Sequence, residues 1–264
     1  MSGNSALELV SESGWRRGLN NMLSSELTRW WKTPLWWVQS LIWCGITTLL
    51  LGIILFTSST PPPSDEVAVL FSLIVGLFPS VGVIIIMQGA LVGQKKDGTA
   101  AWIFSKPVTR SAFIMSKVIA NSLGFLGTMV ALPGIITYIL NIIATGTFWN
   151  PLRFLASLCV IFLFNFFFMS LTLMLGSIFR SRGPVIGISL GLWLLQQNLV
   201  GMLPALRFVL PWNLIIPIGE QAEAVAPSVL VGSQNYTSSL ILFVLLESIL
   251  FILIGLFRFS REEF

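Results

Sequence analysis

The chain has 264 residues, of which 55% are apolar and only 10% are charged, and its mean hydropathy is +0.88. A soluble domain of this length cannot hide that much apolar surface in its core, so the composition excludes a soluble globular protein. The net charge of +4 would suggest nucleic-acid binding in a soluble protein. Here the basic residues lie in short segments beside long apolar runs, as a bilayer sorts them, and we expect no nucleic-acid partner.

The sequence contains no histidine, which removes histidine-based catalytic triads, proton relays and metal ligands. Cys44 and Cys159 both lie in apolar runs, where packing is a commoner role than a disulfide. We therefore expect neither catalytic residues nor a metal site. A removable signal peptide is also not expected, because the first long apolar run begins only near Trp36.

Residues 1–35 are expected to form a cytoplasmic segment that contains an amphipathic helix. Apolar residues recur at helical spacing from Trp15 to Trp30, and basic and small polar residues fill the opposite face. This pattern is typical of an elbow helix in the headgroup layer, and Pro34 then allows a turn into the membrane. Two interpretations stay open, a generic interfacial anchor and an elbow helix that also braces a partner.

Six stretches are long and apolar enough to cross the bilayer, which takes about 20 residues each. They are Trp36–Phe56, Val67–Val92, Val118–Ile143, Phe154–Phe179, Pro184–Leu203 and Tyr236–Phe257. The predicted fold is thus an all-α integral membrane domain over residues 36–257, followed by a cytoplasmic tail over 258–264. Thirteen of the fifteen Lys and Arg fall on one side of these spans. The positive-inside rule then places both ends in the cytoplasm, and we expect a multi-pass protein of the plasma membrane.

The segment from Pro204 to Pro217, ahead of the sixth span, is apolar but interrupted by prolines. It is too broken to span the membrane and too apolar for a free loop. Short re-entrant helices would fit it, provided that protein covers their broken backbone. The alternative is a stretch that lies flat on the outer surface.

Glu247 is the only acidic residue inside a span. A charge at mid-bilayer costs about 2.5–3.5 kcal/mol on insertion scales, so such a residue is a candidate for function. With Gln88 and Asn165 it forms our candidate substrate path or gate. The alternative is a packing or helix-contact role, in which Glu247 is protonated or is hydrogen-bonded to amides such as Gln88, Asn165, Gln196 or Gln197.

Gly183, Gly187 and Gly191 are spaced four apart along the fifth span. Small residues at this spacing let a second helix approach closely. The sequence leaves two interpretations open, packing within one subunit and a subunit interface.

The loop between the second and third spans divides into two predicted helices. Asp97 or Thr99 can cap a short helix that bears Trp102, and Pro107 disfavours helix at the residue before it. Thr109 or Ser111 can cap a second helix that runs into the third span. A short helix held between two spans by tight turns can act as a lever on both.

This loop resembles the signature of ABC transporter permeases of the type 2, export-like class. The family pattern is Gly-Thr, a short apolar helix, Ser-x-Pro-Val-x-Arg and a Lys that enters the third span. The matching residues here are Gly98-Thr99, Trp102-Ile103-Phe104, Ser105-Lys106-Pro107-Val108-Thr109-Arg110 and Lys117. The elbow helix, six spans and broken apolar loop extend the resemblance over nearly the whole chain. One departure is Gln94-Lys95-Lys96-Asp97, where the family often has Glu just before Gly-Thr.

The resemblance implies a permease subunit that pairs with a second copy or a sister permease and with two separately encoded ABC ATPase subunits. The implied ATPase-coupling residues are Gly98, Thr99, Trp102, Ile103, Phe104, Pro107, Arg110 and Lys117. This chain would bind no cofactor, since ATP and Mg²⁺ would lie on the partners, and it lacks the G-x-x-x-x-G-K-[S/T] pattern of an ATPase. The cargo would be amphiphilic, such as a peptide, lipid or drug. The alternative is a membrane scaffold or channel subunit without ATPase coupling.

Overall fold

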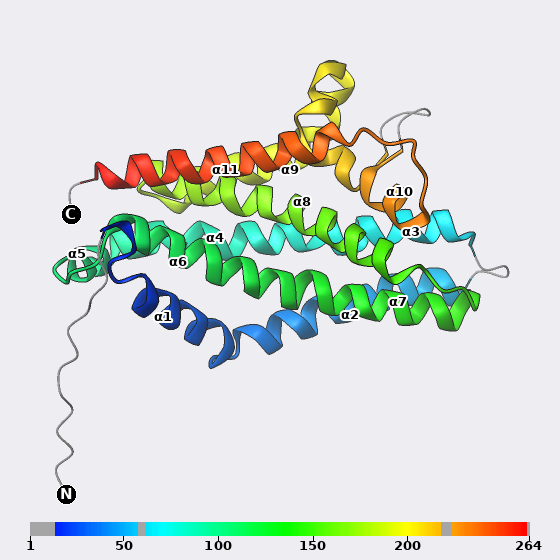
Figure 1. The fold of residues 1–264 in the computed structure, drawn as a ribbon, viewed down its shortest axis with the longest axis horizontal. Helices are drawn as coiled ribbons and strands as arrows, with labels where there is room; N and C mark the ends of the chain where they lie inside the picture. Colours follow the sequence, from blue (N-terminus) through cyan, green and yellow to red (C-terminus); the bar gives the residue numbers. More distant parts are fainter. Residues whose placement is uncertain (1–13, 58–61, 218–222, 263–264) are drawn as a thin grey trace, which may run out of the picture.

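Long helices lying side by side make up the computed structural model of this protein, which describes residues 14–57, 62–217 and 223–262 (Figure 1). Six helical segments within these ranges are long and apolar enough to cross a membrane, which confirms the predicted all-α architecture. Four of the six spans are single helices, and the second and third spans are each interrupted. In chain order the spans are α2 (Leu35–Thr57), α3–η2–α4 (Ser64–Lys96), α6–η3–α7 (Arg110–Thr145), α8 (Pro151–Ile178), α9 (Arg182–Met202) and α11 (Ser239–Ser260).

The second and third spans share an interruption that the sequence analysis did not predict. In the second, a π-helical turn η2 (Leu73–Leu77) joins α3 (Ser64–Ser72) to α4 (Phe78–Lys96). In the third, a π-helical turn η3 (Leu126–Ala131) joins α6 (Arg110–Phe125) to α7 (Leu132–Thr145). Each turn is followed within two residues by a proline, Pro79 or Pro133. A proline has no N–H for the carbonyl four residues earlier, and a widened turn accommodates that missing hydrogen bond.

Helix α8 forms the centre of the bundle. Asn150 caps its first turn by accepting hydrogen bonds from the N–H groups of Leu152 (2.9 Å) and Arg153 (3.4 Å). Apolar residues occur all round the helix, and most of its length is buried against its neighbours, including α4 and α11. A helix that is apolar on every side is typical of such a buried position.

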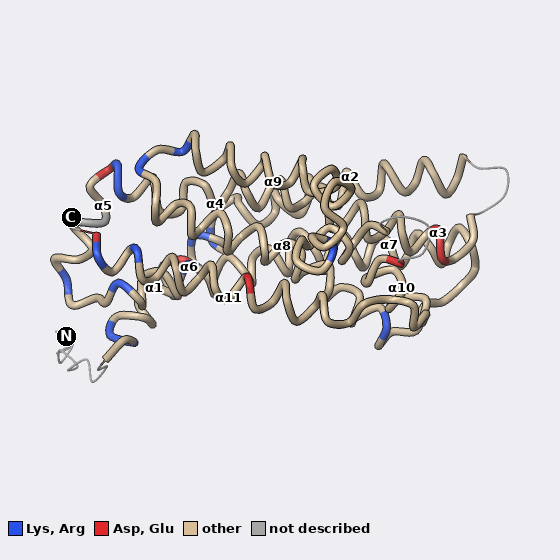
Figure 2. The backbone as a smooth tube through the Cα atoms, turned by 90° about the horizontal axis from the view of Figure 1, so that it is seen from above, with Lys and Arg blue, Asp and Glu red and all other residues tan. Residues whose placement is uncertain are grey.

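Charged residues gather at the two ends of the bundle (Figure 2). The described chain begins and ends at one of them, where the connections α4–α6 and α8–α9 also lie, and most Lys and Arg are found there. α3 lies at the opposite end, and Asp65 and Glu66 are in its first turn. This arrangement agrees with the sides that the sequence assigns to the loops.

Short helices occupy the segment before the last span, as predicted. Two 3₁₀ turns, η4 (Pro204–Phe208) and η5 (Pro211–Leu214), are followed by α10 (Val225–Val231). All four residues of η5 are buried, and η5 contacts α8, α10 and α11. Protein thus covers the broken backbone of η5, while entry of this segment into the membrane stays a prediction.

The predicted boundary between the membrane domain and the tail falls inside a helix. α11 continues to Ser260 rather than ending at Phe257, and Phe259 is buried. Residues 1–13 of the predicted N-terminal segment and 263–264 of the tail lie outside the described residues.

Candidate functional site

The loop between α4 and α6 contains a short helix, α5 (Thr99–Phe104), which confirms the predicted helix in this loop. It follows Gly98, whose φ of 66° is a left-handed conformation that glycine adopts without strain, and the Gly98 carbonyl accepts a hydrogen bond from the Trp102 N–H (3.3 Å). The Ile103 side chain is buried, whereas Trp102 is 62% exposed. The Lys106 ammonium lies 3.6 Å from the centre of the Trp102 ring. α5 therefore has one anchored side and one aromatic, basic side that faces outward.

Three aromatic rings attach α5 to the rest of the bundle. Phe104 of α5 lies 5.4 Å from Phe113 of α6 and 5.9 Å from Phe259 of α11, measured between ring centres. Phe113 and Phe259 are stacked at 5.4 Å. The sequence analysis missed Phe259, although its spacing from the buried Ile252 and Gly255 continues the inward face of α11. α5 is thereby in contact with the last span as well as with the two spans that it connects.

Arg110, at the start of α6, strengthens the same attachment. Its Nη1 donates a hydrogen bond to the carbonyl oxygen of Ser260, and its guanidinium lies 5.8 Å from the Phe104 ring centre. The carbonyl groups at the end of a helix carry partial negative charge, so an arginine there is favourable. Arg110 thus binds the end of α11 to the segment that follows α5.

The N-terminal segment is bound to the start of α6. Thr109 caps α6 by accepting a hydrogen bond from the Ala112 N–H (3.2 Å), and its hydroxyl donates to the Trp15 carbonyl (2.6 Å). The Thr109 N–H donates to the Arg17 carbonyl (3.1 Å). Of the two predicted caps of this helix, the structure uses Thr109.

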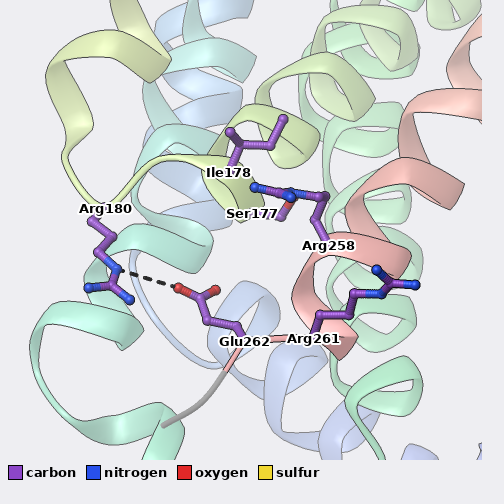
Figure 3. A pocket seen from close by; sticks show the side chains of 6 residues that line it. All are labelled: Ser177, Ile178, Arg180, Arg258, Arg261 and Glu262. Carbon is purple, nitrogen blue, oxygen red and sulfur yellow. Dashed lines mark ion pairs between the residues drawn. The ribbon is translucent and has the colours of Figure 1, made fainter.

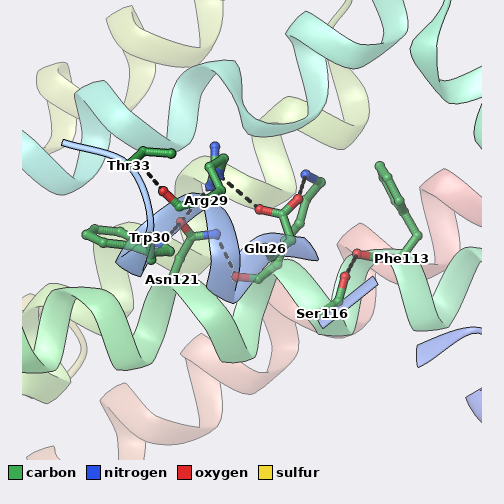
Figure 4. A network of polar contacts seen from close by, with 8 residues as sticks. Glu26, Arg29, Trp30, Thr33, Phe113, Ser116 and Asn121 are labelled. Carbon is green, nitrogen blue, oxygen red and sulfur yellow. Dashed lines mark hydrogen bonds and ion pairs between the residues drawn. The ribbon is translucent and has the colours of Figure 1, made fainter. Parts of the chain in front are cut away.

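A helix in the predicted N-terminal position, α1 (Leu19–Trp31), packs along α6 (Figure 4). Lys117 of α6 is 1% exposed, and its Nζ lies 2.5 Å from a carboxylate oxygen of Glu26 in α1. Arg29 Nε lies 3.1 Å from the other oxygen of Glu26. Lys117, implied by the resemblance to be a coupling residue, is therefore buried beneath α1. The sequence analysis missed Glu26.

Asn121 and Trp30 complete the contact between α1 and α6. The Trp30 indole and Arg29 both donate to the Asn121 side-chain oxygen, at 3.0 and 3.1 Å, and the Asn121 amide donates to the Lys117 carbonyl at 2.7 Å (Figure 4). The fully buried Trp30 ring lies directly over Gly124, where a Cβ would overlap it. A hydrogen-bonded polar network and a close ring contact together hold α1 in place.

The sequence of this chain matches a known protein family. A family model described as ABC-2 family transporter protein matches residues 22–264, from within α1 to the end of the chain. The chain belongs to the ABC-2 transporter family. A comparison with curated proteins gave no match. An ABC-2 permease is the membrane-spanning part of an ABC transporter, and membership implies association with ABC ATPase subunits.

The predicted path residues of this ABC-2 permease lie on three helices. Gln88 is on α4, Asn165 on α8 and Glu247 on α11. Within the described residues no hydrogen bond joins any two of them, so the structure does not contain the alternative in which Glu247 is bonded to Gln88 or Asn165. Each has a buried side-chain oxygen that finds no partner in the described chain. Their role in a substrate path stays a prediction.

The glycines of α9 do not pack against another helix of the same permease. A Cβ placed on Gly183, Gly187 or Gly191 would meet no atom of the described chain within 4 Å. Of the two interpretations of this stripe, close packing within one subunit is therefore wrong for the described part of the chain.

Proposed function

We propose that this chain is the permease subunit of a transporter in which two ABC ATPase subunits dock against α5, with the N-terminal segment beside it. Both ends of the chain face the cytoplasm in this proposal, and the membrane is the plasma membrane. ATP and Mg²⁺ are bound by the ATPase subunits. The work of this chain is a change of packing rather than bond chemistry.

The exposed face of α5 is the observation that carries the proposal. Trp102 and Lys106 offer a partner an aromatic surface and a positive charge, while Ile103 and Phe104 fix the other side of α5 to the bundle. Large aromatic side chains are common anchors in protein interfaces. A partner that moves α5 would move α4 and α6 through the chain, and α11 through Phe259.

The open glycine stripe of α9 supports pairing with a second permease, either another copy of this chain or a sister permease. Since no described residue fills the space beside Gly183, Gly187 and Gly191, a helix of a partner permease can approach there closely. The other spans would then be free to move as a unit against this contact.

The cargo that fits the spans best is amphiphilic, such as a peptide, lipid or drug. The spans are mostly apolar, and the buried oxygens of Gln88, Asn165 and Glu247 without partners are places where donors of a cargo could bind. These three residues are our proposed substrate path or gate.

Co-expression of the tagged permease with ABC ATPase subunits of the same genome tests the coupling role of α5. We expect an ATPase to co-purify with the wild type. Trp102→Ala and Arg110→Glu should reduce the effect of the permease on the rate of ATP hydrolysis by that ATPase. Neither variant should prevent insertion of the permease into the membrane. Arg110→Glu places a negative charge against the carbonyl end of α11.

Trp37→Ala is the matched control, because Trp37 is also an exposed tryptophan but lies on α2. We expect it to behave like the wild type. If no ABC ATPase binds the wild type, the chain is the alternative scaffold or channel subunit. If both Trp102→Ala and Arg110→Glu couple normally, α5 is not the docking helix.

A further inference from the structure

A cavity of about 420 Å³ lies where α8 and α11 end and α9 begins, at the basic end of the bundle (Figure 3). Its lining comes from the last residues of α8, the α8–α9 connection, the last turn of α11 and the two residues that follow α11. The lining residues are Ser177, Ile178, Arg180, Arg258, Arg261 and Glu262. Three arginines and one carboxylate thus surround a single concave space.

The one carboxylate of this cavity is already held by a lysine beneath it. Lys95 of α4 places Nζ 2.5 Å from one oxygen of Glu262, and it also donates to the Ser177 carbonyl (2.7 Å). The Lys95 side chain is 6% exposed. Arg180 lies 3.9 Å from the other oxygen of Glu262 and is largely exposed (Figure 3). Because Lys95 compensates Glu262, the arginines leave the cavity with an excess of positive charge.

The cavity lies where the apolar surface of two spanning helices ends. Ile178, which lines the cavity, and Phe257, one turn before Arg261 in the chain, are exposed apolar side chains. The Arg261 guanidinium lies 4.1 Å from the centre of the Phe257 ring. Arginines next to exposed apolar residues at the end of a span are typical of the headgroup layer, where the charge reaches water and the stem stays in the apolar region.

We propose that this cavity binds the phosphate of an anionic phospholipid headgroup. Guanidinium groups match phosphate oxygens with paired hydrogen bonds, and basic pockets between membrane helices are suited to anionic headgroups. With the topology proposed above, the lipid belongs to the cytoplasmic leaflet. The binding itself does not depend on an ATPase, so it stands or falls separately from the proposed function. A soluble phosphate offers the same chemistry, and the experiment distinguishes the two sources.

Native mass spectrometry of the purified chain in neutral detergent micelles, titrated with phosphatidylglycerol or phosphatidylcholine, tests the proposal. We expect phosphatidylglycerol to bind at least tenfold more tightly than the neutral lipid. Removing two arginines with Arg258→Gln and Arg261→Gln should weaken that binding roughly 25-fold, from about a fivefold loss for each arginine near a headgroup. The matched control, Arg16→Gln with Arg17→Gln, removes two exposed charges from the same end outside the cavity and should change binding less than twofold.

Glu262→Gln provides a second test in case the arginine variants fold poorly. It removes a negative charge that competes with the phosphate, so it should tighten phosphatidylglycerol binding roughly fivefold. Improved binding does not arise from misfolding. The proposal is overturned if phosphatidylcholine binds as tightly as phosphatidylglycerol, if the control pair loses as much binding as the cavity pair, or if Glu262→Gln weakens binding. Displacement of the lipid by millimolar inorganic phosphate would overturn the lipid source and assign the cavity to a soluble anion.

Discussion

The ion pair between α1 and α6 gives a stability prediction whose size follows from burial. Lys117 is 1% exposed and Glu26 is 13% exposed. Removing one partner of a buried pair leaves the other charge uncompensated, at a cost of about 3–5 kcal/mol. Since Glu26 is not fully buried, we expect Glu26→Gln to cost about 3 kcal/mol. Lys117→Met should cost less, because Arg29 still lies 3.1 Å from Glu26.

The double variant Glu26→Gln with Lys117→Met decides the interpretation. It removes both charges and keeps the shape of the lysine stem, so it should be more stable than Glu26→Gln alone. The measurement is the free energy of unfolding by SDS in mixed micelles, followed by tryptophan fluorescence, to which the buried Trp30 contributes. Lys96→Met, an exposed lysine at the same end, is the control and should change stability by no more than about 0.5 kcal/mol. If Glu26→Gln has no larger effect than this control, Lys117 is not paired beneath α1.

Three further predictions use the same purified protein. Gly124→Ala places a methyl group against the Trp30 ring and should lower the free energy of unfolding by about 1–3 kcal/mol. Gly187→Ala places its methyl group in open space and should raise the free energy of unfolding by up to about 1 kcal/mol. Equal effects of the two variants would contradict the packing described. Gly187→Trp should leave the single chain folded but reduce cross-linking to a second permease, and unchanged cross-linking would exclude this face of α9. Hydrogen bonds, chiefly from Ser233, lower the pKa of the Glu223 carboxyl below its unfolded value. The stability that this shift provides is present above the unfolded pKa and is lost as the pH falls through the folded pKa. The thermal unfolding temperature should therefore fall slightly on the acid side, and Ser233→Ala should make that fall smaller. A difference between wild type and Ser233→Ala that does not change with pH would refute this reasoning.

The spans and their order could be predicted because the bilayer imposes a simple rule on the sequence. Every backbone polar group must be bonded within the segment, and about 20 apolar residues are needed to cross. Hydropathy therefore located all six spans, and the candidate caps Asp97 and Thr99 together with Pro107 located α5. The π-helical turns were not predicted, although Pro79 and Pro133 inside the second and third spans were a signal that the helical hydrogen bonding is interrupted there.

The contacts between distant segments could not be predicted from local patterns. The resemblance implied a coupling role for Lys117, but the buried pair with Glu26 depends on how α1 docks on α6, and nothing in either segment alone fixes that docking. A signal was present in the spacing of Glu26 and Arg29, which lie one turn apart on α1 and share a face. Phe259 fell outside the predicted span because Arg258 ends the unbroken apolar run at Phe257.

The polar contacts at the basic end bear on how movement of α5 would travel through the bundle. Lys95 binds the end of α4 to α8 and to Glu262, two residues after α11, and Arg110 binds α6 to the end of α11. With these ends held together, a force on α5 is shared by several helices instead of bending one. The helical hydrogen bonding is interrupted at η2 and η3, in the two spans that α5 connects. Packed helices shift between discrete arrangements rather than deforming continuously, so we expect the basic end to move as one body and the bending to concentrate at η2 and η3.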